Sequence, residues 1–192
     1  MKEIGIFGGS FNPIHNGHIA LAQYILKSFR MDEIWFLVSP QNPLKEQADL
    51  LDDNLRLDMT RKAVLGKPRL TVSDAEFQMP IPSYTWNTLQ WLSKEYPTVS
   101  FTLILGADNW EVFDRWAHHQ DLIDTYRIII YPRRESVVDT QLLPPHVTML
   151  DMPLVDICST EIRERVRDKL PIDHLVPSEI LKDVEKYYAN GQ

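Results

Sequence analysis

Residues 8–18 read GGSFNPIHNGH, and this stretch carries the strongest structural and chemical signal in the chain. It follows the apolar run at residues 4–7, which is typical of a buried strand, and it leads into residues 17–29, whose spacing predicts a helix. Glycines at a strand end allow the backbone to approach a ligand closely. The helix start beyond them presents unpaired N–H groups and the positive end of the helix dipole, which together favour an anion such as phosphate.

The rest of the chain alternates between predicted strands and predicted helices. Strands are expected at residues 33–38, 69–73, 100–105, 127–131 and 147–150, and helices at residues 53–65, 85–95, 159–170 and 178–188, the last two opened by serine N-caps. Continuous apolar strands between helices predict an α/β fold whose parallel sheet is covered by helices on both faces. We expect one domain over residues 1–192, with a small helical part at its C-terminal end.

The loops expected after several strands point to one binding edge. Ligands bind such sheets at the carboxyl ends of the strands, where the strand order reverses. The loops at residues 8–18, 39–45, 106–110 and 132–134 all follow predicted strands, so we expect them to meet at that edge.

Composition limits the classes of function. The 192 residues have 44% hydrophobic side chains, enough for a packed core, and a formal net charge of −7, which disfavours nucleic acid and anionic membranes as partners. No apolar run approaches the ~20 residues of a membrane span. The single cysteine, Cys158, and a start without a charged-then-apolar leader pattern predict a cytoplasmic protein. A homo-oligomer is compatible with these features.

Two histidines indicate the chemistry of the first motif. His15 and His18 flank Gly17, so both can face one point and donate hydrogen bonds to phosphate oxygens, as imidazolium ions or as neutral rings. The main-chain N–H groups of residues 8–11 are expected to add donors. The chain lacks the three-glycine dinucleotide pattern and the Lys-Ser/Thr phosphate loop, which disfavours hydride transfer and Walker-type hydrolysis. Zinc binding by the pair is not expected, because no third ligand is evident.

A second motif at residues 156–163 reads DICSTEIR. Ser159 and Thr160 can cap a helix whose N-terminus aims at an anion, and Arg163, one turn later, can reach the same point. An ordinary capped helix with solvated arginines has the same pattern, so only the combination with the first motif favours a phosphate site. Nucleotidyl transfer needs mainly positioning and cationic or N–H donors, without an enzyme nucleophile when one substrate brings its own phosphate.

These two motifs resemble the HxGH and ISSTxxR-type signatures of the nucleotidyltransferase superfamily with a Rossmann-like fold. Further matches between residues 5 and 166 resemble the bacterial nicotinate-mononucleotide adenylyltransferases; they lie at residues 43–45, 83–89, 106–108, 116 and 133. The resemblance implies that ATP and nicotinate mononucleotide react to nicotinate adenine dinucleotide and pyrophosphate, a step of NAD biosynthesis. It also implies direct in-line attack of the mononucleotide phosphate on the α-phosphorus of ATP, with Mg²⁺ on the polyphosphate.

The resemblance divides the matching residues into three roles. The catalytic groups would be His15, His18 and Arg163. The ATP site would comprise Gly8, Gly9, Ser10, Phe11, Gly106, Asp108, Ile157, Ser159, Thr160 and Arg163. The nicotinate-mononucleotide site would comprise Lys45, Tyr84, Thr85, Trp116 and Arg133, with the face of Trp116 against the pyridine ring. No side chain is implied as a metal ligand.

Four positions depart from the family pattern. Asn12 stands in place of the commoner aspartate, Cys158 in place of serine, Ala117 in place of an aromatic residue, and Arg134 in place of proline. The last two departures lie on the acceptor side, so the acceptor is less firmly indicated than the phosphate chemistry.

Three alternatives therefore stay open. A phosphopantetheine adenylyltransferase shares both end motifs, although its first motif typically has threonine where His15 stands. A preference for nicotinamide mononucleotide fits the same residues. Outside the enzymes, a non-catalytic nucleotide sensor has the same fold, but that reading requires the loss of catalytic groups that this chain retains.

Overall fold

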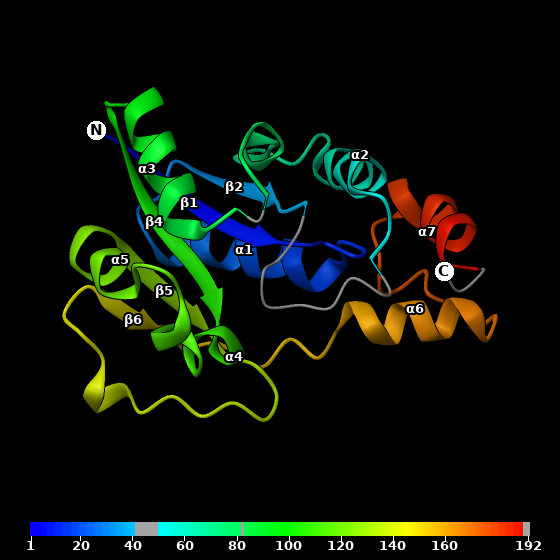
Figure 1. Cartoon of the computed structure of the whole chain (residues 1–192). Helices are drawn as coiled ribbons and strands as arrows, with labels where there is room; N and C mark the ends of the chain where they lie inside the picture. Colours follow the sequence, from blue (N-terminus) through cyan, green and yellow to red (C-terminus); the bar gives the residue numbers. More distant parts are fainter. Residues whose placement is uncertain (41–49, 82, 190–192) are drawn as a thin grey trace.

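Six parallel strands form the centre of the protein in a computed structural model that describes residues 1–40, 50–81 and 83–189 (Figure 1). The strands are β1 (Lys2–Gly9), β2 (Glu33–Val38), β3 (Leu70–Ser73), β4 (Val99–Gly106), β5 (Arg127–Tyr131) and β6 (Val147–Met149). Their order is β3-β2-β1-β4-β5-β6, and every neighbouring pair is parallel. The strand order reverses between β1 and β4, so the carboxyl ends of these two strands border the crevice in which such sheets bind ligands.

The helices connect the strands and cover the sheet. They are α1 (Asn16–Ser28), α2 (Asp53–Val64), α3 (Thr85–Glu95), α4 (Ala107–Trp110), α5 (His119–Thr125), α6 (Ser159–Arg167) and α7 (Leu181–Tyr188). Short 3₁₀ turns lie at Ala75–Gln78, Phe113–Arg115, Thr140–Leu142 and Ser178–Ile180. Within the described ranges, no helix is long and apolar enough to cross a bilayer.

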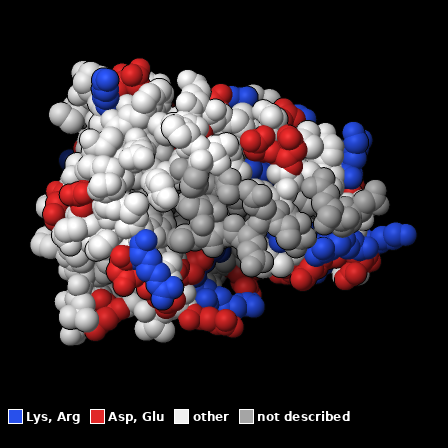
Figure 2. Space-filling view, in the orientation of Figure 1, with Lys and Arg blue, Asp and Glu red and all other residues white. Residues whose placement is uncertain are grey.

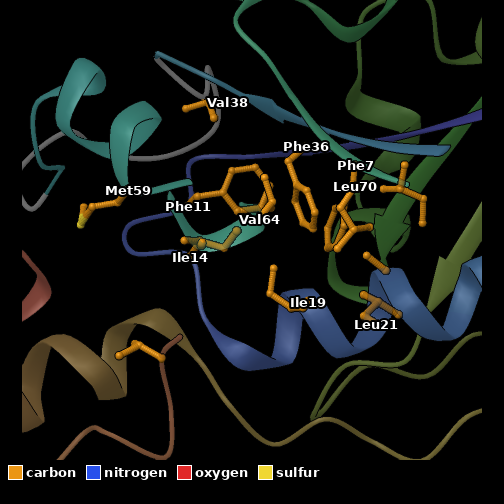
Figure 3. Close-up of a cluster of buried hydrophobic side chains, with 14 of the residues drawn as sticks. Phe7, Phe11, Ile14, Ile19, Leu21, Phe36, Val38, Met59, Val64 and Leu70 are labelled. Carbon is orange, nitrogen blue, oxygen red and sulfur yellow. The ribbon is translucent and has the colours of Figure 1, made fainter. Parts of the chain in front are cut away.

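Two hydrophobic clusters lie on opposite faces of the sheet. Alternate residues of β4 serve different clusters, since Ile104 belongs to one and Leu103 and Leu105 to the other. The first cluster packs the sheet against α1, α2, α6 and α7, and the second packs it against α3 and α5. Figure 3 shows part of the first cluster, where the Phe7 and Phe36 rings stack with their centroids 5.4 Å apart. The predicted parallel α/β sheet with helices on both faces is confirmed.

The predicted serine N-caps are wrong. The N-cap of α6 is Cys158, whose Sγ accepts a hydrogen bond from the Glu161 N–H at 3.4 Å, so Ser159 is the first helical residue. In the predicted helix 178–188, residues Ser178–Ile180 form a 3₁₀ turn and α7 begins at Leu181. In both cases the residue before the serine is the N-cap, so the serine lies one residue inside the turn.

Candidate active site

The first motif forms the connection between β1 and α1 at the carboxyl edge of the sheet. Phe11 has a φ of 44°, a left-handed conformation that is unfavourable for a bulky side chain and must be held by its surroundings. Its buried ring packs edge-on against Phe7 and Phe36, with centroids 5.9 and 5.5 Å apart. The His18 ring also meets Phe11 edge-on, at 5.2 Å, so the ring of Phe11 anchors the loop between the core and the histidine.

The two histidines are stacked, with ring centroids 3.6 Å apart and 25° between the planes. His15 is only 3% exposed, and burial, together with the positive charge of Arg133, lowers its pKa to about 3. The His15 side chain is therefore neutral near pH 7, which decides between the two protonation states left open for it. The main-chain N–H of His15 donates to Nδ1 of His18 at 3.2 Å. A neutral His18 with an accepting Nδ1 carries its proton on Nε2, where it can be donated.

The glycine between the histidines is required by packing. A Cβ on Gly17 would lie 2.8 Å from Cγ1 of Val155 and 3.0 Å from Nδ1 of His15. Any side chain would therefore displace either the histidine or the segment that precedes α6.

Two residues of the second motif hold carbonyl groups of the first. Arg163 Nη1 donates to the Asn12 carbonyl at 2.9 Å, and Ser159 Oγ donates to the Pro13 carbonyl at 2.9 Å. Arg163 Nη2 also donates to Thr160 Oγ1 at 3.3 Å. The structure thus brings the predicted motifs together although nearly 150 residues separate them. Figure 1 places α6 at the end of the sheet toward which β1 points.

Two pockets adjoin at this edge. The larger is a cavity of about 140 Å³ whose lining includes six residues of the predicted site, namely Gly8, Gly9, Tyr84, Thr85, Gly106 and Trp116. The smaller, of about 20 Å³, is lined by His15 and His18 together with Ile157 and Arg133. Tyr131 at the end of β5 lines both pockets. The resemblance predicts Arg133 in the nicotinate-mononucleotide site, but in the structure it lines the same pocket as the two histidines.

Asp108 forms an ion pair with Arg133, which lines the smaller pocket. Arg133 Nε lies 3.6 Å from Asp108 Oδ1, and the Arg133 guanidinium lies 5.3 Å from the centre of the Tyr131 ring. A Cβ on Gly106 would lie 2.3 Å from the same Asp108 oxygen. The glycine at the end of β4 therefore makes room for this pair.

Sequence reasoning missed Glu76, a buried acid in the larger pocket. Its carboxylate accepts hydrogen bonds from Ser83 Oγ at 2.7 Å and from Thr88 Oγ1 at 3.1 Å, and burial raises its pKa. These bonds fix the segment that leads through Tyr84 into α3. The sequence offers no signal for this contact, because Glu76 lies outside both motifs.

Ser10 lies in the loop after β1, where its carbonyl accepts from Arg56. Lys45 lies outside the described residues.

The comparisons with known proteins agree with this geometry. A family model described as cytidylyltransferase-like matches residues 6–165. The chain is 47% identical over 182 residues to a Bacteroides fragilis protein named probable nicotinate-nucleotide adenylyltransferase, a match that covers 95% of this chain and 90% of the relative. It is 40% identical over 181 residues to a Porphyromonas gingivalis protein of the same name, over 94% and 92% of the two chains.

A solved structure shows the same fold. It is Plasmodium falciparum nicotinic acid mononucleotide adenylyltransferase complexed with NaAD, which superimposes with a TM-score of 0.80 at 22% sequence identity. The match covers 97% of this chain and 96% of the other.

Proposed function

Because the chain belongs to the cytidylyltransferase-like family and, within it, to the nicotinate-nucleotide adenylyltransferases, we propose that it transfers AMP from ATP to nicotinate mononucleotide. The products are nicotinate adenine dinucleotide and pyrophosphate. The observation that carries the proposal is that His15, His18 and Arg163 lie together at the carboxyl edge of the sheet. The larger pocket, which has Trp116 in its wall, adjoins them there. We place the reaction, a step of NAD biosynthesis, in the cytoplasm.

The transfer is a single displacement at the α-phosphorus of ATP. An oxygen of the mononucleotide phosphate forms a bond to this phosphorus while the bond to the oxygen bridging to the β-phosphorus breaks, and its electron pair leaves with pyrophosphate. His18 donates from Nε2 to the phosphate oxygens on which negative charge grows, and His15 holds the His18 ring through the stack and the Nδ1 contact. Arg163 adds positive charge beside the loop. No protein nucleophile is needed, because the acceptor phosphate attacks directly.

The acceptor ring occupies the larger pocket. The indole of Trp116 offers a flat face to the pyridine ring. The nicotinate carboxylate is held at the start of α3, where Tyr84 is the N-cap without a side-chain cap and the first-turn N–H groups favour an anion. Arg115 also lines this pocket and adds a positive charge. We further propose that Lys45 contacts the acceptor.

We propose that Mg²⁺ accompanies ATP rather than residing in the protein. Over the ranges that the structure describes, no group of three His, Cys, Asp or Glu side chains could hold a metal ion. Mg²⁺ commonly binds to substrate phosphates and retains several waters, and it would offset the charge of the polyphosphate.

Pyrophosphate release with ATP and Mg²⁺ tests the function when three acceptors are compared: nicotinate mononucleotide, nicotinamide mononucleotide and phosphopantetheine. We expect clear preference for nicotinate mononucleotide. Turnover with phosphopantetheine alone would keep the phosphate chemistry but refute the acceptor assignment. No release with any acceptor would favour the nucleotide sensor.

A further inference from the structure

Arg56 lies beneath residues 8–11, the proposed phosphate-binding loop, and its side chain is completely buried. It projects from α2, and its relative exposure is 0%. Its guanidinium donates to the carbonyl groups of Leu51 at 2.8 Å, Ser39 at 2.9 Å and Pro40 at 3.0 Å, and also to that of Ser10. The sequence gives no sign of this burial, because arginine is almost never fully buried unless its charge is paired.

The chemistry of these contacts is unusual for a structural arginine. All four acceptors are neutral main-chain carbonyls, and burial lowers the pKa of the guanidinium, which nonetheless stays protonated. A buried cation is costly unless its donors are satisfied. The three segments that supply the acceptors are the β1–α1 loop, the end of β2 and the approach to α2. Two of these segments border the proposed substrate pockets.

The contact with Ser10 determines where the next amide points. In a trans peptide the carbonyl oxygen and the following N–H lie on opposite sides of the bond. Because Arg56 holds the Ser10 carbonyl from below, the Phe11 N–H is directed away from Arg56. Phe11 also has the unfavourable φ of 44°, so a restraint on the preceding peptide is needed to keep the loop in this shape.

The contact with Ser39 extends the effect to the larger pocket. Ser39 lines that pocket, its N–H donates to the Gly9 carbonyl at 2.9 Å, and its own carbonyl accepts from Arg56 at 2.9 Å. One guanidinium thus fixes the ends of β1 and β2 relative to each other.

We propose that Arg56 is a positioning residue for the adenylyl transfer: it orients the phosphate-binding loop at residues 8–11 from beneath and supplies a buried positive charge under it. This inference rests on the proposed function. Arg56 does not touch substrate; it acts through the main chain of the loop. Lysine at this position keeps the charge but lacks the planar fork that reaches several carbonyls at once.

The test measures affinity for α,β-methylene-ATP with Mg²⁺ by calorimetry in the wild type, Arg56→Lys and a matched control. The control is Met59→Ala, which removes a completely buried side chain from the same helix and lies outside the site. We expect Arg56→Lys to weaken binding about tenfold, as for a lost charge-assisted hydrogen-bond set. Met59→Ala is expected to stay within about twofold of the wild type, although its melting temperature falls at least as far.

Several outcomes would overturn the inference. Wild-type affinity in Arg56→Lys would do so, and so would equal weakening in Met59→Ala, because the effect would then reflect stability alone. If Arg56→Lys does not melt cooperatively, Arg56→Gln is measured in its place, with the same expectation. A wild type that does not bind the analogue would refute the proposed function together with this inference, whereas normal binding in the Arg56 variants refutes this inference alone.

Discussion

His15 links the acid stability of the protein to its candidate active site. Its folded pKa of about 3 lies below the ordinary value of 6.5, so between these values the unfolded chain binds a proton that the folded chain refuses. The contribution of neutral His15 to the free energy of unfolding is therefore fully present above about pH 6.5 and is lost as the pH falls toward 3. Over that window the wild type should lose about 1.4 kcal/mol per pH unit more than His15→Asn. Urea unfolding of both proteins at pH 7, 6, 5 and 4 measures this difference, and parallel curves would contradict it.

At Gly17 the surrounding side chains leave no room for a Cβ atom. Gly17→Ala forces a Cβ against Val155 and His15, and we expect it to cost about 1–3 kcal/mol of unfolding free energy and to reduce kcat/KM strongly. Gly8→Ala is the matched stability control, because a Cβ there meets nothing within 4 Å. Urea unfolding compares the two variants. Equal stability in both would show that the packing around Gly17 is not tight.

The roles of the residues in both motifs could be predicted from the sequence because each motif is a short, continuous stretch. Three local patterns indicate phosphate binding before the tertiary structure is known. They are a glycine pair after a strand, two histidines around a glycine, and an arginine one turn into a helix. Arg56, Glu76 and Tyr131 could not be found this way. Their roles depend on which distant segment lies opposite each side chain, and this is known only once the strand order is known.

At the scale of elements, the cap of α6 is weaker than the sequence permits. The Cys158 thiol is a poor acceptor and lies 3.4 Å from the Glu161 N–H. Cys158→Ser should stabilise the protein by about 0.5 kcal/mol, and Cys158→Ala should destabilise it by about as much. Urea unfolding at pH 7 provides the comparison. A serine variant less stable than the wild type would show that the thiol contributes by packing rather than by capping.

The strands and long helices were predictable because their apolar patterns are strong. Residues 33–38, 85–95 and 127–131 match their predicted bounds, since each element ends one or two residues before a proline. The short helices α4 and α5 were not predicted, because four and seven residues are too few to show a helical period. The sequence favours Ser159 as a cap because serine is common at that position, yet its hydroxyl donates to the Pro13 carbonyl in a contact that only the tertiary structure reveals.

At the scale of the whole molecule, two pockets adjoin on one edge of the sheet, and we propose that the larger one holds the acceptor ring while the reacting phosphates lie toward the histidines. Figure 2 shows basic and acidic side chains next to one another at several places on the visible face. Cations near the site include Arg133 in the histidine pocket, Arg163 beside the loop and Arg115 in the larger pocket.

The division predicts separable kinetic effects. Trp116→Ala should raise the KM for nicotinate mononucleotide at least tenfold and change the KM for ATP less than about threefold, because Trp116 lines only the larger pocket. His18→Ala should instead lower kcat at least about a hundredfold with the fold intact, because it removes a donor to the transition state. Steady-state kinetics with each substrate varied in turn separates these effects. A Trp116→Ala variant with both KM values raised equally would contradict the assignment of the pockets.

Exchange of labelled pyrophosphate into ATP tests the central claim, direct adenylyl transfer, most directly. It is measured with Mg²⁺, with and without nicotinate mononucleotide. Direct attack predicts that label enters ATP only when the mononucleotide is present, because reversal requires the dinucleotide. Exchange without the mononucleotide would mean that the protein itself carries AMP, and absence of exchange under both conditions would mean that no adenylyl transfer occurs.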